Sequence, residues 1–398
     1  MLIGIVGKPS VGKSSFFKAA TMVDVKIAAY PFTTIDPNKA VGYVRVQCAD
    51  KDLGVQCNPR VGFCKNHIRF VPVELMDVAG LVPGAHEGKG LGNKFLNDLG
   101  QADVLIHIVD VSGSTNEVGE SVPPLSYDPA NDIRFLETEL DMWYFDVIKR
   151  GWEKMARKAQ TSKIHIETAV ADHLSGFRVT EAMARKAIEE LKLDKERPTT
   201  WSEEQLKELA LRFRKETKPT IIVCNKIDVP GAEKNFARLK EEFKEHMLVP
   251  CSADAEIALR EASKKGLVDY VPGEGKFTIK SGVNEKQKAA LEFIQKNLLE
   301  KFGSTGIQNS LDAAVFDFLK YIAIFPGGVS KLGDKEGRIM PDCFLMPPGT
   351  TALDFANKIH TDLGKGFLYA IDVRTKMRIS GDQKLKHRDV IEIISAAK

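Results

Sequence analysis

The segment from Leu2 to Ser14 constrains the fold more than any other part of the sequence. An apolar run rich in β-branched residues ends at Val6 and predicts a buried strand. The pattern G-x-x-x-x-G-K-S follows, and then residues that start a helix. Glycines let such a turn bring backbone N–H groups and the positive helix end onto phosphate oxygens. The sequence therefore predicts a phosphate-binding loop made of Gly7, Lys8, Pro9, Ser10, Val11, Gly12, Lys13, Ser14 and Ser15. In such a loop we expect Lys13 to reach the β- and γ-phosphates and the Ser14 hydroxyl to bind Mg²⁺.

The bulk composition excludes few classes of protein. A chain of 398 residues with 28% charged residues is ordinary for two or three globular domains. A net charge of +3 is too small to indicate nucleic-acid binding on its own. We expect neither a signal peptide nor a membrane span, because the first strand begins directly after the start and no apolar run reaches ~18 residues. Six cysteines do not form a disulfide framework at this length, so a cytoplasmic location is the default.

Two later segments are expected to sense the γ-phosphate. The first has adjacent threonines in a loop, where Thr34, or less favourably Thr33, would complete the Mg²⁺ shell; the alternative is a plain surface loop. In the second, an apolar strand leads into D-x-x-G, in which Asp77 would hold Mg²⁺ and the Gly80 N–H would bond the γ-phosphate. Four glycines follow within residues 81–92, as expected of a segment that changes conformation.

A base-recognition pattern, N-K-x-D, follows another apolar strand. Here the Asp228 carboxylate can accept hydrogen bonds from N1–H and N2–H₂ of guanine, whereas adenine offers no such pair of donors. Asn225 is expected to tie this loop to the phosphate-binding loop, with the Lys226 stem over the base. The small-residue turn at Ser252 and Ala253 would place a backbone N–H against guanine O6.

Three cysteines and a histidine lie close together in the sequence, with the spacing C-x8-C-x6-C-x2-H at Cys48, Cys57, Cys64 and His67. Three thiolates and an imidazole suit a closed tetrahedral zinc site. The spacing is not a common zinc pattern, however, and single cysteines between strands are often small buried apolar residues. The sequence leaves both interpretations open and favours free thiols slightly over zinc, with a disulfide not expected.

The second half of the chain reads as helices and then a small mixed module. Apolar residues recur at helical spacing from Ile133 to Ile148, with Asp132 as the expected N-cap. Further helices are expected over residues 178–193 and 203–216, the latter capped by Thr200 or Ser202, and the region reads as an antiparallel pair of long helices. Helices are also expected over 284–302 and 310–324. The last ~70 residues predict a ubiquitin-like α+β module of three strands and one helix.

Taken together, the motifs resemble a GTPase of the class related to translation factors. The segments Tyr30–Thr34 and Gly80–Asn93 resemble the Obg superfamily, and within it the YchF, or Obg-like ATPase, family in an archaeal form. The resemblance implies an α/β P-loop GTPase domain with a helical, coiled-coil-like insertion and a C-terminal TGS-like domain. The implied divisions are the first part of the GTPase domain, the insertion, the second part with a helical connection, and the TGS-like domain, at residues 1–119, 120–215, 216–330 and 331–398.

Three residues depart from patterns in the resembling families. Members of the YchF family typically lack N-K-x-D and prefer ATP, so the retained Asp228 predicts GTP. Several relatives have Asn at the position of Ser10, where it can support a catalytic potassium ion, so the sequence leaves potassium stimulation of this chain open. Leu81 stands where many small GTPases have a water-orienting Gln, which predicts slow hydrolysis without help. His86 is a candidate to orient or deprotonate water, and the favoured alternative is a solvent-facing histidine.

The sequence thus predicts a monomeric, Mg²⁺-dependent GTPase that acts as a molecular switch, with Lys13, Thr34, Gly80 and His86 at the reacting phosphate. The insertion and the TGS-like domain would report the bound GTP or GDP to the ribosome or an RNA. Two alternatives remain open: an ATP-preferring enzyme of the family, and a nucleotide-gated RNA or protein binding module with negligible turnover.

Overall fold

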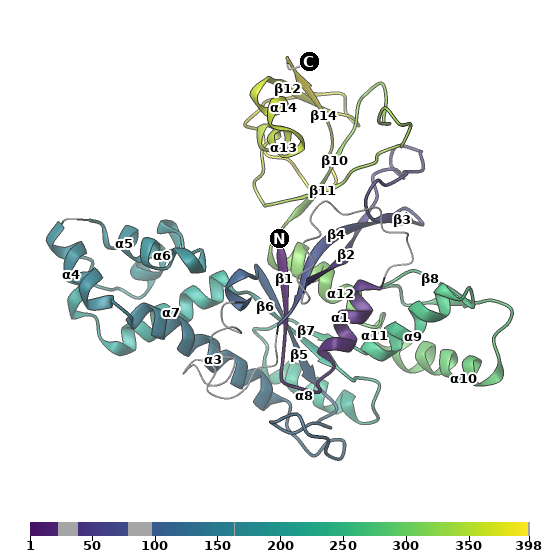
Figure 1. Ribbon diagram of the computed structural model, residues 1–398, viewed down its shortest axis with the longest axis horizontal. Helices are drawn as coiled ribbons and strands as arrows, with labels where there is room; N and C mark the ends of the chain where they lie inside the picture. The colour runs from purple at the N-terminus through teal and green to yellow at the C-terminus, as the bar shows by residue number, and fades with distance from the viewer. Residues whose placement is uncertain (23–38, 79–97, 163, 397–398) are drawn as a thin grey trace. The chain divides into compact units, whose positions relative to one another are not determined.

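The computed structural model describes residues 1–22, 39–78, 98–162 and 164–396 (Figure 1). These residues form two compact units, and the chain passes through each unit twice. The first unit comprises residues 1–17 and 75–253, and the second comprises residues 18–74 and 254–398. The domain boundaries expected from the sequence stay a prediction. None of the described helices is both long and apolar enough to span a membrane.

A parallel sheet forms the centre of the first unit. In this sheet β1 (Leu2–Val6) pairs with β5 (Val104–Asp110), which pairs with β6 (Thr220–Asn225), followed by β7 (Leu248–Pro250). Every residue of β1 and β5 is buried, as continuous apolar runs predict for strands covered on both faces. The end of β4 (Ile68–Asp77) lies beside β1. The carboxyl ends of these strands therefore meet at one edge, where an open α/β sheet binds its ligands.

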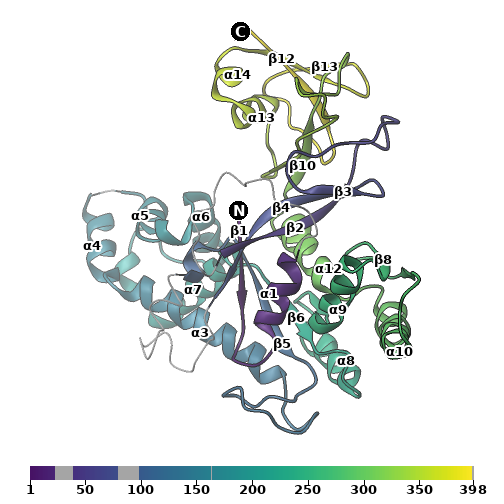
Figure 2. The ribbon, with the colours of Figure 1, turned by 45° about the vertical axis from the view of Figure 1, so that its right-hand side comes forward.

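Helices complete the first unit. α1 (Lys13–Thr21) begins in this unit directly after β1 and its loop, and α8 (Ala232–Glu242) lies between β6 and β7. Five further helices form an insertion between β5 and β6, namely α3 (Ala130–Lys149), α4 (Trp152–Ser162), α5 (Ile166–His173), α6 (Glu181–Glu190) and α7 (Glu203–Thr217). Figures 1 and 2 show α4, α5 and α6 gathered at one end of α3 and α7.

The insertion differs in part from the expected pair of long helices. α3 and α7 do run antiparallel, because Lys149 at the end of α3 pairs with Glu203 at the start of α7 at 2.9 Å. However, the three shorter helices share one hydrophobic core with them, so the insertion is a small helical domain and not a coiled coil. Ser202 caps α7 in a capping box with Gln205, as expected. Asp132 does not cap α3, because the helix already begins at Ala130.

The second unit contains β2, β3, most of β4 and several helices. β2 (Lys39–Gln47) neighbours β4, and β3 (Phe63–Lys65) forms an antiparallel hairpin with β4. Asn284 caps a long helical stretch that runs to Phe302, as the sequence predicted. The other elements before the C-terminal module are α9 (Ala253–Lys264), β8 (Val268–Tyr270), β9 (Phe277–Ile279), α10 (Glu285–Ile294), α11 (Glu300–Phe302) and α12 (Ile307–Asp312).

The C-terminal module is a five-stranded sheet in the order β11-β10-β14-β12-β13, with two helices. Its elements are β10 (Ile322–Pro326), β11 (Phe344–Met346), α13 (Ala352–Ile359), α14 (Thr361–Lys365), β12 (Phe367–Asp372), β13 (Arg378–Ile379) and β14 (Val390–Ser395). The expected helix over 310–324 is wrong at its end. Its helical part stops at Phe318, and Ala323, Ile324 and Phe325 are fully buried in β10 between two other strands. A short, wholly apolar run fits a buried strand as well as a helix end, which explains the error.

Candidate nucleotide-binding site

The loop between β1 and α1 has the backbone that a phosphate-binding loop requires. Gly7 and Gly12 have φ angles of 151° and 96°, and Ser10 also has a positive φ of 63°. A Cβ atom on Gly7 would lie 2.5 Å from the Ile108 carbonyl oxygen, and one on Gly12 would lie 2.2 Å from Asn225 Nδ2. Both glycines are therefore required by space as well as by conformation.

The Lys13 ammonium and the Asp77 carboxylate interact electrostatically at the edge of the sheet. Lys13 Nζ donates to the Lys8 carbonyl oxygen at 2.8 Å. Burial lowers the pKa of Lys13, and the nearby Asp77 carboxylate opposes that shift. Burial likewise raises the pKa of Asp77, and Lys13 opposes it. Asp77 Oδ1 is buried and has no hydrogen-bond partner among the described residues.

A buried carboxylate oxygen without a partner is costly unless a cation supplies the missing interaction. Ser14 lies exposed in the first turn of α1. A hydroxyl and a carboxylate are ligands that Mg²⁺ accepts, and Mg²⁺ binds through few protein ligands plus phosphates. The donor set therefore fits a magnesium ion held by Ser14 and Asp77. Thr34, the third expected ligand, lies outside the described residues.

The Lys8 side chain points into the protein, so the predicted contact of Lys8 with phosphate is left to its backbone. Lys8 is 5% exposed and its Nζ pairs with Asp132 Oδ2 at 2.8 Å. The same ammonium donates to the Thr115 carbonyl oxygen at 3.0 Å and lies 3.8 Å from the centre of the Tyr127 ring. Only the backbone of Lys8 is left for phosphate. Its side chain instead fastens the loop to the start of α3, and Asp132 is its partner and not a helix cap.

Asn225 connects its own loop after β6 to the phosphate-binding loop and to the turn after β7. The sequence predicted the connection to the phosphate-binding loop. Asn225 Nδ2 donates to the Val11 carbonyl oxygen at 2.8 Å, and its Oδ1 accepts the Ala253 N–H at 3.1 Å. The turn after β7 is thereby fixed next to the phosphate-binding loop. The Ala253 N–H is occupied by this bond, whereas the sequence assigned that turn to guanine O6. The neighbouring Ser252 is 1% exposed.

Asp110, at the end of β5, holds Lys226 and was missed by the sequence analysis. Lys226 has a φ of 63°, and its Nζ donates to Asp110 Oδ2 at 2.8 Å. Asp110 is 1% exposed and also accepts hydrogen bonds from the hydroxyls of Ser112, Ser114 and Thr115. Burial alone would raise the pKa of Asp110, but the bonds from Lys226 and Ser112 lower it overall. The available signal was an acidic residue at the end of a buried strand, followed by three hydroxyl residues.

Asp228 follows two residues after Lys226 and is half-buried. Its carboxylate has no ion-pair or hydrogen-bond partner in the part of the chain that the structure describes. Because Asn225 and Lys226 fix the loop directly before Asp228, this carboxylate is both positioned and open to a ligand. The remaining expected site residues, Thr33, Thr34, Gly80, Leu81 and His86, lie outside the described residues and stay predictions.

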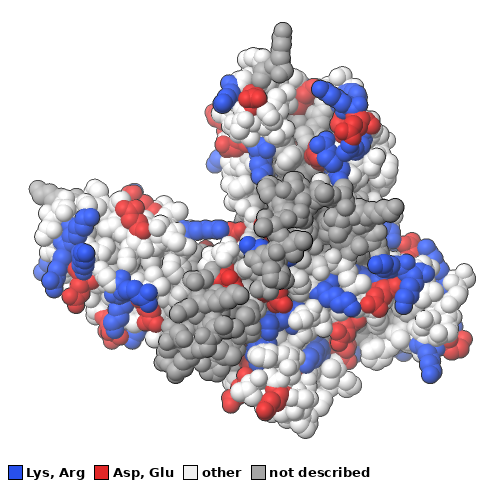
Figure 3. All heavy atoms as spheres, viewed as in Figure 1, with Lys and Arg blue, Asp and Glu red and all other residues white. Residues whose placement is uncertain are grey.

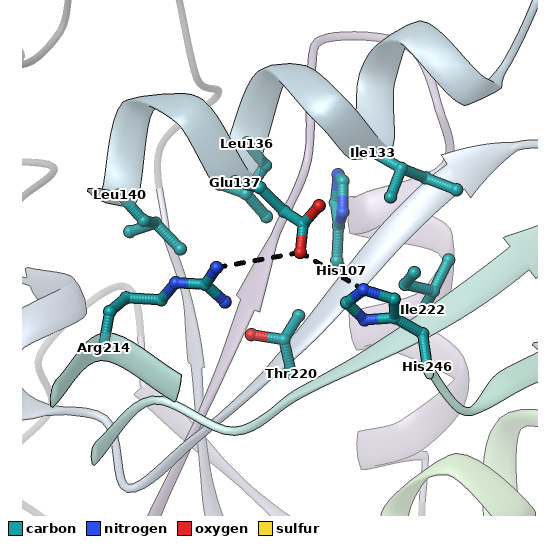
Figure 4. A pocket seen from close by; sticks show the side chains of 9 residues that line it. All are labelled: His107, Ile133, Leu136, Glu137, Leu140, Arg214, Thr220, Ile222 and His246. Carbon is teal, nitrogen blue, oxygen red and sulfur yellow. Dashed lines mark ion pairs between the residues drawn. The ribbon is translucent and has the colours of Figure 1, made fainter. Parts of the chain in front are cut away.

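His107 lies in β5 under α3, in a small cavity of about 10 Å³ (Figure 4). Figure 4 shows the Glu137 carboxylate between Arg214 and His246. Glu137 pairs with Arg214 at 3.8 Å and with His246 at 3.2 Å. Burial lowers the pKa of His107 to about 3, so the imidazole is neutral near pH 7. His107 is therefore a buried residue of β5.

A parallel sheet with a phosphate-binding loop after β1, an acidic residue at the end of β4 and N-K-x-D after β6 defines a P-loop GTPase fold. Residues 2–133 match the family described as 50S ribosome-binding GTPase. Residues 223–328 match the Obg-like GTPase YGR210-like, G4 motif-containing domain, and residues 334–395 match the TGS domain.

Known proteins are similar to this chain over its whole length. A GTP-binding protein from Methanocaldococcus jannaschii is 47% identical over 398 residues, which is 100% of both chains. The chain therefore belongs to the Obg-like, or YchF, family of GTPases, as the sequence motifs predicted. The crystal structure of a GTP-binding protein from Pyrococcus horikoshii OT3 is similar over 100% of both chains, with 37% identity and a TM-score of 0.78. The ribosome-binding ATPase YchF of Bacillus subtilis is 27% identical over 95% of this chain and 90% of its own.

Proposed function

We propose that this family member binds GTP in preference to ATP, hydrolyses it slowly with Mg²⁺, and acts as a switch that reports to the ribosome. The Asp228 carboxylate is the observation that supports a preference for guanine over adenine. It is open to a ligand, and Asn225 and Lys226 hold its loop by bonds to Val11 and Asp110. Guanine offers this carboxylate two N–H donors, whereas adenine would leave the charge unpaired, at a cost of about 1–3 kcal/mol or more.

The chain's own residues supply the phosphate end of the site. Lys13 exchanges its bond to the Lys8 carbonyl oxygen for phosphate oxygens, and the loop N–H groups bind the same anion. Ser14 and Asp77 would hold Mg²⁺, with Thr34 as the proposed third ligand, and the ion would supply positive charge beside the phosphates. Leu81 cannot orient water by hydrogen bonding, so turnover is slow unless His86 or a partner supplies that role.

A competitive titration of GTP and ATP against a fluorescent nucleotide, with Mg²⁺ present, tests the choice of base. We expect tighter GTP binding, and the change Asp228→Asn should weaken GTP at least about tenfold while leaving ATP unchanged. Glu241→Gln serves as the matched control, because Glu241 is an exposed carboxylate on α8. Tighter ATP binding by the unmodified protein would overturn the GTP assignment and favour the ATPase alternative, the activity for which the Bacillus subtilis relative is named.

Two observations support the ribosome as the binding partner. The Bacillus subtilis relative is named a ribosome-binding ATPase. In addition, α4 carries three exposed basic residues, Lys154, Arg157 and Lys158, against one acidic residue, and Figure 3 shows basic side chains gathered over this helix. Phosphate backbones attract such a surface. Cosedimentation with ribosomes, with a GTP analogue and with GDP, tests the partner; equal absence from the pellet in both states would reject it.

Hydrolysis is tested by multiple-turnover phosphate release with and without ribosomes. We expect slow release alone and faster release with ribosomes. Leu81 favours a second candidate function, a nucleotide-gated binding module with negligible turnover. No release in either condition, together with intact nucleotide binding, would select that module over the enzyme.

A further inference from the structure

Three cysteines of the second unit converge on one buried carboxylate. Cys48 follows β2, and Cys64 lies in β3 of the β3–β4 hairpin. The hairpin turns tightly through Asn66 and His67, which have positive φ angles of 54° and 60°. The Cys48 N–H donates to the His67 carbonyl oxygen at 2.8 Å, which holds the hairpin turn against the end of β2.

The intervening loop brings in Asp50 and Cys57. Asp50 is fully buried, and its Oδ2 accepts the Cys57 N–H at 3.0 Å. Cys48 and Cys57 are 0% and 6% exposed. One ligand atom from each of Cys48, Asp50, Cys57 and Cys64 lies within 4.8 Å of all the others.

The spacing of these atoms suits a tetrahedral ion. Cys48 Sγ and Cys57 Sγ are 3.6 Å apart, and Cys64 Sγ is 3.9 Å from Asp50 Oδ2. Zinc bonds of about 2.3 Å to sulfur and 2.0 Å to oxygen place tetrahedral ligands about 3.8 Å apart for two sulfurs and about 3.5 Å for sulfur and oxygen. The observed distances are close to these values, whereas a disulfide would need about 2.05 Å between sulfurs.

We propose that Cys48, Asp50, Cys57 and Cys64 bind one structural Zn²⁺. Thiolates favour zinc over magnesium or calcium, and four protein ligands close the site to substrate. This set replaces His67 of the sequence hypothesis with Asp50. His67 Nδ1 lies 2.9 Å from Asp50 Oδ1, so the imidazole orients the carboxylate and leaves Oδ2 for the ion. His67 is thus a positioning residue, and its side chain is 37% exposed on the outer side of the cluster.

The zinc ion would hold the surface on which the start of the C-terminal module is fastened. The Asn58 and Arg60 N–H groups donate to the carbonyl oxygens of Ile339 and Pro341 at 2.8 and 2.9 Å. The Arg388 guanidinium, from the module itself, donates to the Gln47 carbonyl oxygen at 2.8 Å. The contacts of Asn58 and Arg60 depend on the shape of residues 48–62, a stretch without helix or strand. Metal bonds at both ends of this stretch fix that shape.

Metal analysis of the purified full-length protein tests the site. We expect one zinc per chain, released when the thiols are titrated with an organomercurial. Cys57→Ser should lose the zinc, and Cys343→Ser, a change of a half-buried cysteine outside the cluster, should retain it. Wild-type protein that contains no zinc and takes up none from added zinc would overturn the proposal.

Three further measurements separate the ligand set from a folding defect. Asp50→Asn should weaken zinc binding more than His67→Gln, for which a loss of about 10–100-fold is expected of an outer partner. Equal losses in the two variants would reject the assignment of Asp50 as the ligand and His67 as its positioning residue. In the wild-type protein, Co²⁺ substitution should give a tetrahedral thiolate spectrum, and zinc removal should speed amide hydrogen exchange at Asn58 and Arg60. An octahedral spectrum, or unchanged exchange on zinc removal, would contradict the proposal.

Discussion

Asn225 Nδ2 donates to the Val11 carbonyl oxygen across 214 positions of sequence, at 2.8 Å, and fastens the loop after β6 to the phosphate-binding loop. The same amide passes so close to Gly12 that a Cβ atom there would lie 2.2 Å from Nδ2. The two loops therefore hold each other in position, and a change in either should affect both ends of a bound nucleotide.

Asn225→Ala should remove this link. The Val11 carbonyl oxygen and the Ala253 N–H both lose a buried partner, which predicts a loss of about 1–3 kcal/mol in the free energy of unfolding. Affinity for GDP and GTP should fall at least tenfold, because the base loop is no longer fixed. Fluorescent nucleotide titration and urea denaturation measure the two effects. Asn235→Ala is the matched control, because Asn235 donates to the Val111 carbonyl oxygen outside the phosphate-binding loop; an equal loss of nucleotide affinity in that variant would contradict the argument.

Gly12→Ala should abolish nucleotide binding by displacing Asn225. The added methyl group meets Asn225 Nδ2, and the φ of 96° is already unfavourable for alanine. Gly54→Ala provides the control, since Gly54 has a φ of 65° but nothing within 4 Å of the added carbon. That variant should lose about 1 kcal/mol of stability and keep full nucleotide affinity. Nucleotide binding by Gly12→Ala at wild-type affinity would show that the loops can separate without consequence.

Lys8→Met should be strongly destabilising, because it leaves Asp132 buried without its cation. Breaking a buried ion pair by removing one partner costs about 3–5 kcal/mol. Adding Asp132→Leu to Lys8→Met should recover most of that loss, since both charges are then gone. A double-mutant cycle on the free energy of unfolding measures the coupling. Additive effects of the two changes would show that the pair is not coupled.

The local sequence was sufficient for the parts of the site that depend on residue type and spacing. Gly7, Gly12 and Asn225 could be assigned because a turn with a given φ, or a bridging amide, restricts which residue can stand there. The strands β1, β5 and β6 were equally clear, because each is a continuous apolar run followed by a motif.

Choices between long-range partners could not be predicted. Lys226 could pair with many carboxylates, and only the pairing of β5 with β6 brings Asp110 to it. Lys8 reads as a loop lysine until α3 is seen to place Asp132 beside it. In the cysteine cluster, spacing could not show that Asp50 is buried while His67 lies outside it. These assignments depend on how elements pack and not on the local pattern.

Asp77→Asn should have opposite effects on the free and the nucleotide-bound protein. Burial raises the pKa of Asp77 despite the opposing Lys13 ammonium, and its Oδ1 has no hydrogen-bond partner among the described residues, so the charge carries a net cost in the absence of Mg²⁺. The neutral amide should raise the melting temperature of the nucleotide-free protein by a few degrees. It should also remove the additional stabilisation that Mg²⁺ gives in the presence of GTP. Thermal unfolding with nucleotide, in Mg²⁺ or in EDTA, measures both; a variant that keeps the full Mg²⁺ effect would exclude Asp77 as a ligand.

The pH dependence of stability should depend on His107. Burial lowers its pKa to about 3 in the folded protein, against about 6.5 in the unfolded chain. Below pH 6.5 the unfolded chain therefore binds a proton that the folded protein does not, and stability falls as the pH falls. Between pH 7 and pH 5 this linkage amounts to about 2 kcal/mol.

The variant His107→Gln should remove that part of the slope. Glu137 borders the same cavity and has a pKa lowered chiefly by its hydrogen bond from His246, so its own contribution is lost only below about pH 4.5. Measurements from pH 7 to pH 5 therefore leave out most of the contribution of Glu137. Urea denaturation of His107→Gln should show a decrease smaller by about 2 kcal/mol than in the wild type. His165→Gln, a change of an exposed histidine, should keep the wild-type slope; a slope for His107→Gln equal to that of this control would show that His107 takes up its proton in the folded state.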